Sequence, residues 1–115
     1  MTALNGLFKN AVKAAIGNSF QTIYTAPALK DSYAIELDVA NNGNTGVQIT
    51  ARLYDISAGV TANIVKLAPV PVGSAIQIID GQKIVLEAGD YIEVKCDTPG
   101  ETVDVILSLV EDVNS

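Results

Sequence analysis

A hydrophobic period of two runs through most of the chain after residue 20, and it is the feature that most constrains the fold. In residues 33–39 the large apolar side chains face one way, and Glu36 and Asp38 face the other. Such alternation is typical of a strand with one buried face. Residues 47–54 repeat the pattern, and the Asn- and Gly-rich residues 41–46 lie between them. The pattern therefore predicts two strands joined as a hairpin.

Further segments have the composition of strands, namely residues 20–26, 61–67, 75–79, 83–87, 91–96 and 102–110. Asp80-Gly81 predicts a tight turn between two of them, because both positions tolerate positive φ. Prolines at positions 69 and 71 remove backbone donors, so we expect residues 69–73 to form a sheet edge or a crossing between two sheets.

These short strands, separated by Gly, Pro and Asn turns, predict an all-β, single-domain antiparallel β-sandwich of about eight strands over residues 20–115. Eight strands favour a jelly-roll-like fold over a seven-stranded immunoglobulin-type domain. The immunoglobulin domain would also need a Cys–Trp–Cys pattern, and this chain has one cysteine and no tryptophan.

Residues 1–19 follow a different pattern and are predicted to be an N-terminal arm. Their apolar residues recur at steps of three and four, which fits either a short helix or an extended segment. The first 30 residues carry three lysines and no acid, whereas all 13 acids follow. We expect the arm to bind a partner, more by hydrophobic contact than by charge, through Leu4, Leu7, Phe8, Lys9, Val12, Lys13 and Ile16. Lys30 is assigned to the sandwich.

The composition excludes several classes of function. With no histidine and a single cysteine, the chain cannot build a histidine-activated nucleophile, an internal disulfide or a cysteine zinc site. Its pI near 4.3 disfavours nucleic acid as a partner. No apolar run approaches the ~20 residues needed to span a membrane. We therefore expect no enzyme activity, cofactor, nucleic acid or membrane contact. Because 49% of residues are hydrophobic and only 17% charged, we expect contact with other subunits.

Two groups of oxygen side chains resemble chemical sites. Glu36 and Asp38 project about 6–7 Å apart from one strand face, a spacing that suits acid–base chemistry or a divalent cation. No histidine or third ligand supports them, so we interpret them as a solvated strand face. Residues 38–44 are rich in oxygen ligands, but they lack the spacing and the closing Glu of a calcium loop. We interpret that loop as a turn.

Cysteine and tyrosine also have two interpretations each. Cys96 shares a strand face with Ile92 and Val94, which favours packing over reactivity. The four tyrosines could form a sugar-stacking platform, but they are spread over four predicted strands, and this favours packing. They are Tyr24, Tyr33, Tyr54 and Tyr91.

Four segments together resemble small β-sandwich virion structural proteins of tailed bacteriophages, of the capsid cement or decoration type. They are residues 22–28, the Asn-rich turn, residues 69–74 and residues 86–94, and the resemblance extends over residues 12–110. It implies a homotrimer that sits where capsomers meet and ties major capsid proteins together. It carries no catalytic residues. Tail and fibre components contain similar modules.

The sequence thus yields one leading hypothesis and two alternatives. The leading one is a trimeric capsid cement protein that stabilises the icosahedral shell of a virion assembled in the host bacterial cytoplasm. On that hypothesis, deletion of residues 2–18 leaves a folded body with weakened attachment. The first alternative is a tail, head-fibre or receptor-binding component that recognises host-surface glycan. The second is an enzyme that uses Glu36 and Asp38.

Overall fold

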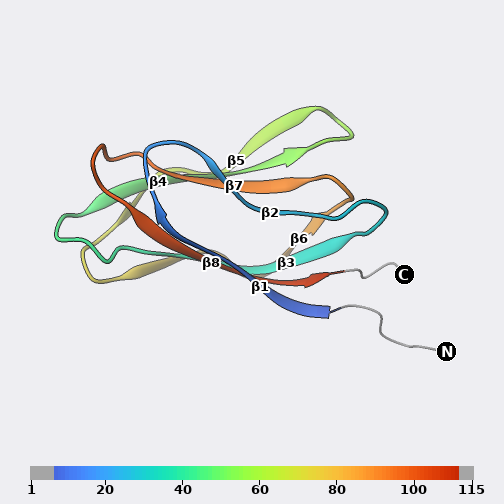
Figure 1. Ribbon diagram of the computed structural model, residues 1–115, viewed down its shortest axis with the longest axis horizontal. Helices are drawn as coiled ribbons and strands as arrows, with labels where there is room; N and C mark the ends of the chain where they lie inside the picture. The colour runs from blue at the N-terminus through green and yellow to red at the C-terminus, as the bar shows by residue number, and fades with distance from the viewer. Residues whose placement is uncertain (1–6, 112–115) are drawn as a thin grey trace.

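The computed structural model describes residues 7–111, which form eight strands (Figure 1). The strands are β1 (Leu7–Ile16), β2 (Gln21–Thr25), β3 (Ser32–Ala40), β4 (Val47–Asp55), β5 (Val60–Val70), β6 (Ala75–Leu86), β7 (Tyr91–Cys96) and β8 (Val103–Glu111). Within this described part of the chain, no helix could cross a membrane.

The strands form two four-stranded antiparallel sheets, with β1 and β2 nearest the viewer in Figure 1. Sheet A has the order β1-β8-β3-β6, and sheet B has the order β2-β7-β4-β5. The pairs β1–β8, β2–β7, β3–β6 and β4–β5 are all hydrogen-bonded. The chain is thus one long hairpin wrapped into two layers, which is the connectivity of a jelly roll. The predicted antiparallel sandwich of jelly-roll type is confirmed.

Alternating side chains fill the space between the sheets, as the period of two predicts. Along β8 the inward residues Val103, Val105, Leu107 and Leu109 are at most 1% exposed. Along β7 the inward residues Ile92, Val94 and Cys96 are completely buried. Full burial of one such aliphatic side chain contributes about 1.5–3 kcal/mol, so these two strands supply much of the core.

The segment predicted to be an arm is extended, and it forms an edge strand of sheet A. β1 pairs with β8 from Leu7 opposite Glu111 to Ile16 opposite Val103. The expectation that this segment has no place in the core is wrong for Ile16, which is fully buried. The register shifts before Ile16, and Ala15 there has a φ of 57°. This irregularity turns Ile16 inward, a change of face that residue spacing cannot reveal.

The Asp80-Gly81 pair lies inside the single long strand β6, so the predicted turn is wrong. Ala34 on β3 pairs with Ile84, whereas Glu36 pairs with Asp80, so three β6 residues lie opposite Ile35. Gly81 has a φ of 75°, which serves this bulge and does not reverse the chain. The expected count of eight strands holds because β1 is gained and two predicted strands merge.

The predicted hairpin between residues 33–39 and 47–54 is also wrong, because β3 belongs to sheet A and β4 to sheet B. Alternation identifies strands but does not determine which of them pair. The proline segment behaves as expected. Pro69 pairs with Gln48 near the end of β5, an edge strand of sheet B, and the chain then crosses to β6 in sheet A.

Candidate interaction surface

The structure separates the seven residues that were predicted to bind a partner. Phe8 and Val12 are 84% and 60% exposed on β1, and Lys13 is also exposed. Leu7 opens β1, whereas Leu4 lies outside the described residues. Ile16 belongs to the core. Of the apolar residues in this set whose burial the structure describes, Phe8 and Val12 are available to a partner and Ile16 is not.

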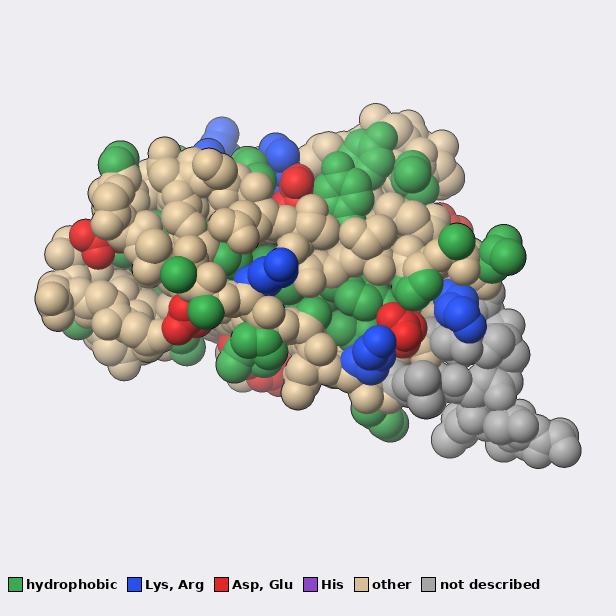
Figure 2. Space-filling view, viewed as in Figure 1, with side chains coloured by type: hydrophobic (Ala, Val, Ile, Leu, Met, Phe, Trp, Pro, Cys, Tyr) green, Lys and Arg blue, Asp and Glu red, His purple; other side chains and the backbone are tan. Residues whose placement is uncertain are grey.

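Lys9 is engaged within its own domain. Its Nζ donates to Oε1 of Glu111 at 3.2 Å, and Oε2 of Glu111 accepts from the Tyr24 hydroxyl at 2.6 Å. The Tyr24 hydrogen bond lowers the pKa of Glu111, and burial followed by the Glu111 contact raises the pKa of Tyr24 to about 12. In Figure 2, basic and acidic side chains lie side by side near the grey terminal residues. The network links β1, β8 and β2. An inward-pointing lysine on an edge strand such as β1 also opposes pairing of that edge with the strand of another chain.

The outer face of sheet A carries an apolar row that crosses all four strands. Phe8 pairs with Val110, Val110 with Tyr33, and Tyr33 with Val85. The row ends at Val85, which is 53% exposed on β6, the strand at the opposite edge of the sheet from β1. A second outward pair is Val12 with Ile106, which are 60% and 45% exposed. Sequence reasoning missed Val85 and Ile106, because the strand pairing that aligns them was unknown.

A carboxylate group formed by Glu36, Asp38 and Asp80 lies beside the apolar row. Glu36 and Asp38 share the outer face, as predicted, and Asp80 pairs directly with Glu36 from β6. Burial, a hydrogen bond with Glu36 and the charges of Glu36 and Asp80 raise the pKa of Asp38 to about 6. Oδ1 of Asp38 is buried and has no hydrogen-bond partner among residues 7–111. The interpretation as a solvated face is therefore incomplete for Asp38.

The outer face of sheet A is hollowed between the apolar row and the carboxylate group. The hollow has a volume of about 300 Å³ and is lined by Phe8, Lys9, Asn10, Ile35, Ser108 and Leu109. Ile35 reaches this surface because the register of β3 shifts between Ala34 and Glu36, opposite the bulge of β6. The prediction that the large apolar residues of 33–39 all face away from Glu36 and Asp38 is therefore wrong for Tyr33 and Ile35, whereas Leu37 and Val39 are buried as expected. Neither Glu36 nor Asp38 lines the hollow.

On the outer face of sheet B, two basic side chains are paired with carboxylates. Arg52 Nε lies 2.7 Å from Oε1 of Glu93, and Lys95 Nζ lies 3.2 Å from Oδ1 of Asp97. The Arg52 guanidinium also lies 3.5 Å from the centre of the Phe20 ring, and Lys95 Nζ lies 4.9 Å from it. These contacts satisfy the charges of Arg52 and Lys95, whereas Lys66 on β5 is exposed.

Two of the four tyrosines come together on sheet B. The rings of Tyr54 and Tyr91 stack with centroids 5.0 Å apart. Tyr33 lies on sheet A beneath the Lys83 amine, and Tyr24 donates to Glu111. A platform of all four tyrosines is thus not formed.

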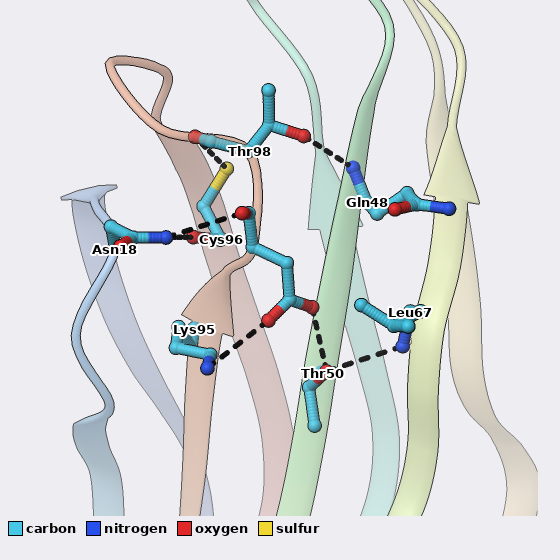
Figure 3. Close-up of polar contacts among 8 residues, drawn as sticks. Asn18, Gln48, Thr50, Leu67, Lys95, Cys96 and Thr98 are labelled. Carbon is cyan, nitrogen blue, oxygen red and sulfur yellow. Dashed lines mark hydrogen bonds and ion pairs between the residues drawn. The ribbon is translucent and has the colours of Figure 1, made fainter.

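A polar clamp holds β4, β5 and β7 together at one end of the sandwich (Figure 3). The Thr50 hydroxyl donates to Oδ2 of Asp97 at 2.6 Å and accepts from the Leu67 backbone N–H at 3.2 Å. The Thr98 hydroxyl accepts from the Gln48 N–H at 3.1 Å. Nδ2 of Asn18 donates to the carbonyl of Cys96 at 3.0 Å. This clamp accounts for the nearly complete burial of Thr50, which lies on an outer face.

The closest acidic cluster in the described part of the chain is structural. Asp55, Glu87 and Asp90 place carboxylate oxygens within 4.8 Å of one another. Both oxygens of Asp90 accept backbone N–H groups, from Ile56 at 3.0 Å and Glu87 at 2.9 Å. Oδ1 of Asp55 accepts the hydroxyl and N–H of Ser57, and these bonds lower its pKa. These carboxylates therefore fix turns.

The loop that resembles a calcium site is organised by Asn41, which is 1% exposed. Its Nδ2 donates to the carbonyls of Thr45 at 2.8 Å and Val70 at 3.0 Å, and its Oδ1 accepts the N–H of Gly43 at 2.9 Å. This residue thus uses its side chain to tie the loop to β5, and the interpretation as a turn is confirmed.

Cys96 is a packing residue, as predicted. It is completely buried on the inner face of β7, and burial raises the pKa of its thiol. Sγ lies 3.7 Å from the carbonyl oxygen of Thr98, so even its weak donor has an acceptor nearby.

Comparisons with known proteins identify the fold. Neither the protein-family models nor the curated proteins that were searched match this sequence. Among solved structures, a protein of Bacillus endospore appendages, described as a family of disulfide-linked pili, is similar over 99% of this chain and 93% of its own, with a TM-score of 0.59 and 15% identity. A chain of infectious bursal disease virus, Gt strain, aligns with 93% of this chain and 33% of its own, at a TM-score of 0.48 and 13% identity. At these identities the likeness to the appendage protein is one of fold.

Proposed function

We propose that the protein is a non-enzymatic structural subunit that works through protein–protein contacts in an assembly of many copies. The observation that carries this proposal is the apolar row of Phe8, Val110, Tyr33 and Val85 on the outer face of sheet A, in which Phe8 and Val85 are exposed and Val110 and Tyr33 are half-buried. A contiguous apolar patch on a soluble domain is typical of an interaction surface. Within this class, the function we favour is a trimeric capsid cement protein of a tailed bacteriophage that binds major capsid proteins.

A catalytic function has less support. Glu36 and Asp38 face outward from a sheet and do not line the hollow beside them. The acidic cluster at Asp90 is occupied by backbone N–H groups. Neither arrangement places a carboxylate in a cleft where it could position a substrate.

A subunit of a pilus-like filament is the second candidate. It is favoured by the likeness to the endospore appendage protein, which spans nearly the whole of both chains. That protein belongs to a family described as disulfide-linked, whereas this chain has one cysteine, and Cys96 is completely buried. A filament of this chain would therefore rest on non-covalent contacts.

Glycan recognition by a tail or head fibre is the weakest of the structural readings. It needs exposed aromatic faces with free polar groups beside them. Tyr54 and Tyr91 instead stack on each other, and the neighbouring Arg52 is engaged by Glu93 and Phe20.

Immunogold labelling of particles and filaments from the producing cells, combined with analytical ultracentrifugation of the purified chain, tests the proposal. A cement protein would decorate the whole shell and sediment as a trimer of the 12.0 kDa chain. Labelling along fibres would favour the filament. A monomer that labels no assembly would refute the structural role.

A further inference from the structure

The two outer faces of the sandwich differ in how their charges are satisfied. On sheet B, Arg52 and Lys95 each contact a carboxylate. On sheet A, none of Glu36, Asp38 and Asp80 has an ion-pair partner among residues 7–111. Glu36 and Asp80 are direct cross-strand neighbours, and like charges in that position destabilise a sheet. A cation brought by a partner would relieve this repulsion.

We infer that the outer face of sheet A binds a protein partner that presents an apolar side chain to the hollow at Ile35 and a lysine or arginine to Glu36, Asp38 and Asp80. This inference rests on the proposed structural function and adds the surface and the chemistry of the partner. The partner is the shell or filament protein to which the subunit attaches.

The apolar part of the surface is arranged for insertion of a side chain. Phe8 and Ile35 contribute apolar side chains to the lining of the hollow, and Asn10 and Ser108 contribute polar ones. A volume of about 300 Å³ accommodates one aliphatic or aromatic side chain. Anchors that fill such pockets supply a large share of the affinity of an interface.

The carboxylate part selects the charge of the partner. Gln77 gives Glu36 one long hydrogen bond, at 3.4 Å, and Oδ1 of Asp38 accepts none from the described residues. β8 places the uncharged Ile106 and Ser108 opposite Asp38 and Glu36. The outward base on β6, Lys83, lies over the Tyr33 ring, with its Nζ 5.4 Å from the ring centre. The carboxylate group thus lacks an internal counter-ion, and a basic residue of a partner complements it.

A second copy of the chain is a poorer occupant. If two copies met through this same face, each carboxylate group would approach its own counterpart unless a base met it. The bases on the strands of sheet A within residues 7–111 are Lys9, which is paired with Glu111, Lys13 on the edge strand β1, and Lys83, which lies over the Tyr33 ring. The chain also carries a net charge of −6, so self-association through an acidic face is opposed further.

Footprinting of the full chain, free and in its native assembly, locates the surface. Hydroxyl radicals would report on Phe8, Tyr33 and Val85, and carbodiimide coupling would report on Glu36 and Asp80. We expect several-fold protection of these residues in the assembly, with Tyr54 and Tyr91 on sheet B unchanged. Protection of the two sheet B tyrosines with no change on sheet A would overturn the inference and leave the structural function standing. Protection of sheet A in the purified chain would mean that the face is covered by self-association, and this would overturn the inference of a basic protein partner.

Measuring how tightly variants attach to the assembly distinguishes an effect of the charge at Asp38 from an effect on the fold. Asp38→Asn preserves the shape of the side chain and should weaken attachment about tenfold, which is equivalent to about 1.4 kcal/mol. Glu101→Gln, which removes a charge from the loop before β8, is the control and should leave attachment unchanged. Equal attachment of Asp38→Asn and the natural chain, or no dependence of attachment on salt, would contradict the role of the carboxylate group.

Discussion

The replacement Asp38→Asn should make the free subunit more stable at neutral pH. Asp38 is partly buried and lies near the carboxyl groups of Glu36 and Asp80, and together these raise its pKa from 3.8 to about 6. Folding therefore makes the charged form of this side chain less favourable than it is in the unfolded chain. Asparagine has the same shape and no charge, and its amide can donate to Glu36. The replacement thus removes an unfavourable charge without leaving a cavity.

The size of the effect follows from the two pKa values. A rise from 3.8 to about 6 corresponds to about 3 kcal/mol of unfavourable free energy for the charged carboxylate, as an upper limit. Because the side chain is partly exposed, solvent and salt screen its charge, so we expect about 1–2 kcal/mol.

The direction of the pKa shift predicts how the free energy of unfolding changes with pH. A raised pKa means that the folded state binds the proton more tightly than the unfolded state. The natural chain therefore loses this part of its stability as the pH rises from about 4 through about 6, whereas Asp38→Asn does not. The difference between the two chains should be near zero at acidic pH and full at slightly alkaline pH.

Urea unfolding followed by far-ultraviolet circular dichroism measures this difference at several pH values. Glu36→Gln removes the neighbouring charge and should give part of the same gain, and Glu101→Gln controls for net charge. A destabilised Asp38→Asn at neutral pH, or a gain that is the same at every pH, would refute the account of this carboxylate group.

The remaining predictions concern the clamp, the core thiol and β1. Thr50→Val removes the acceptor of the Leu67 N–H and the donor to Asp97, so it should cost about 1–3 kcal/mol in urea unfolding; an unchanged midpoint would contradict the clamp. Cys96 should react with a thiol reagent only after denaturant is added, because it is buried and its pKa is raised; rapid labelling of the native chain would refute its burial. Deletion of residues 2–18 should destabilise the domain strongly, since it removes the edge strand and the buried Ile16, whereas Phe8→Ser should change stability little and weaken attachment. Equal loss of stability in these last two variants would contradict the exposure of Phe8.

The layers of the fold could be predicted from sequence because alternation marks which side chains face inward. The inward residues of β7 and β8, including Cys96, were assigned correctly on this basis. The pairing of strands could not be predicted, since alternation does not encode partners. The wrong hairpin turns predicted at Asp80-Gly81 and at residues 41–46 have this cause. Residues that favour turns form a bulge within β6 at Asp80-Gly81, and they form a crossing between the two sheets at residues 41–46.

The candidate surface was predictable only in part. The sequence predicts Phe8 and Val12 as binding residues in a segment that could be helical or extended. It also predicts that Glu36 and Asp38 are carboxylates on one strand face. The contributions of Asp80, Val85 and Ile106 depend on register across sheet A, which brings together residues far apart in the chain. The step at Ala15 that buries Ile16 has no signal in residue type, because a non-glycine residue with positive φ is uncommon.

The number of copies of the chain per assembly tests the structural role most directly. Quantitative mass spectrometry of purified shells or filaments that contain the protein would supply it. The account predicts many copies in a fixed ratio to the major shell or filament protein. One or a few copies per particle, or a ratio that varies between preparations, would contradict it.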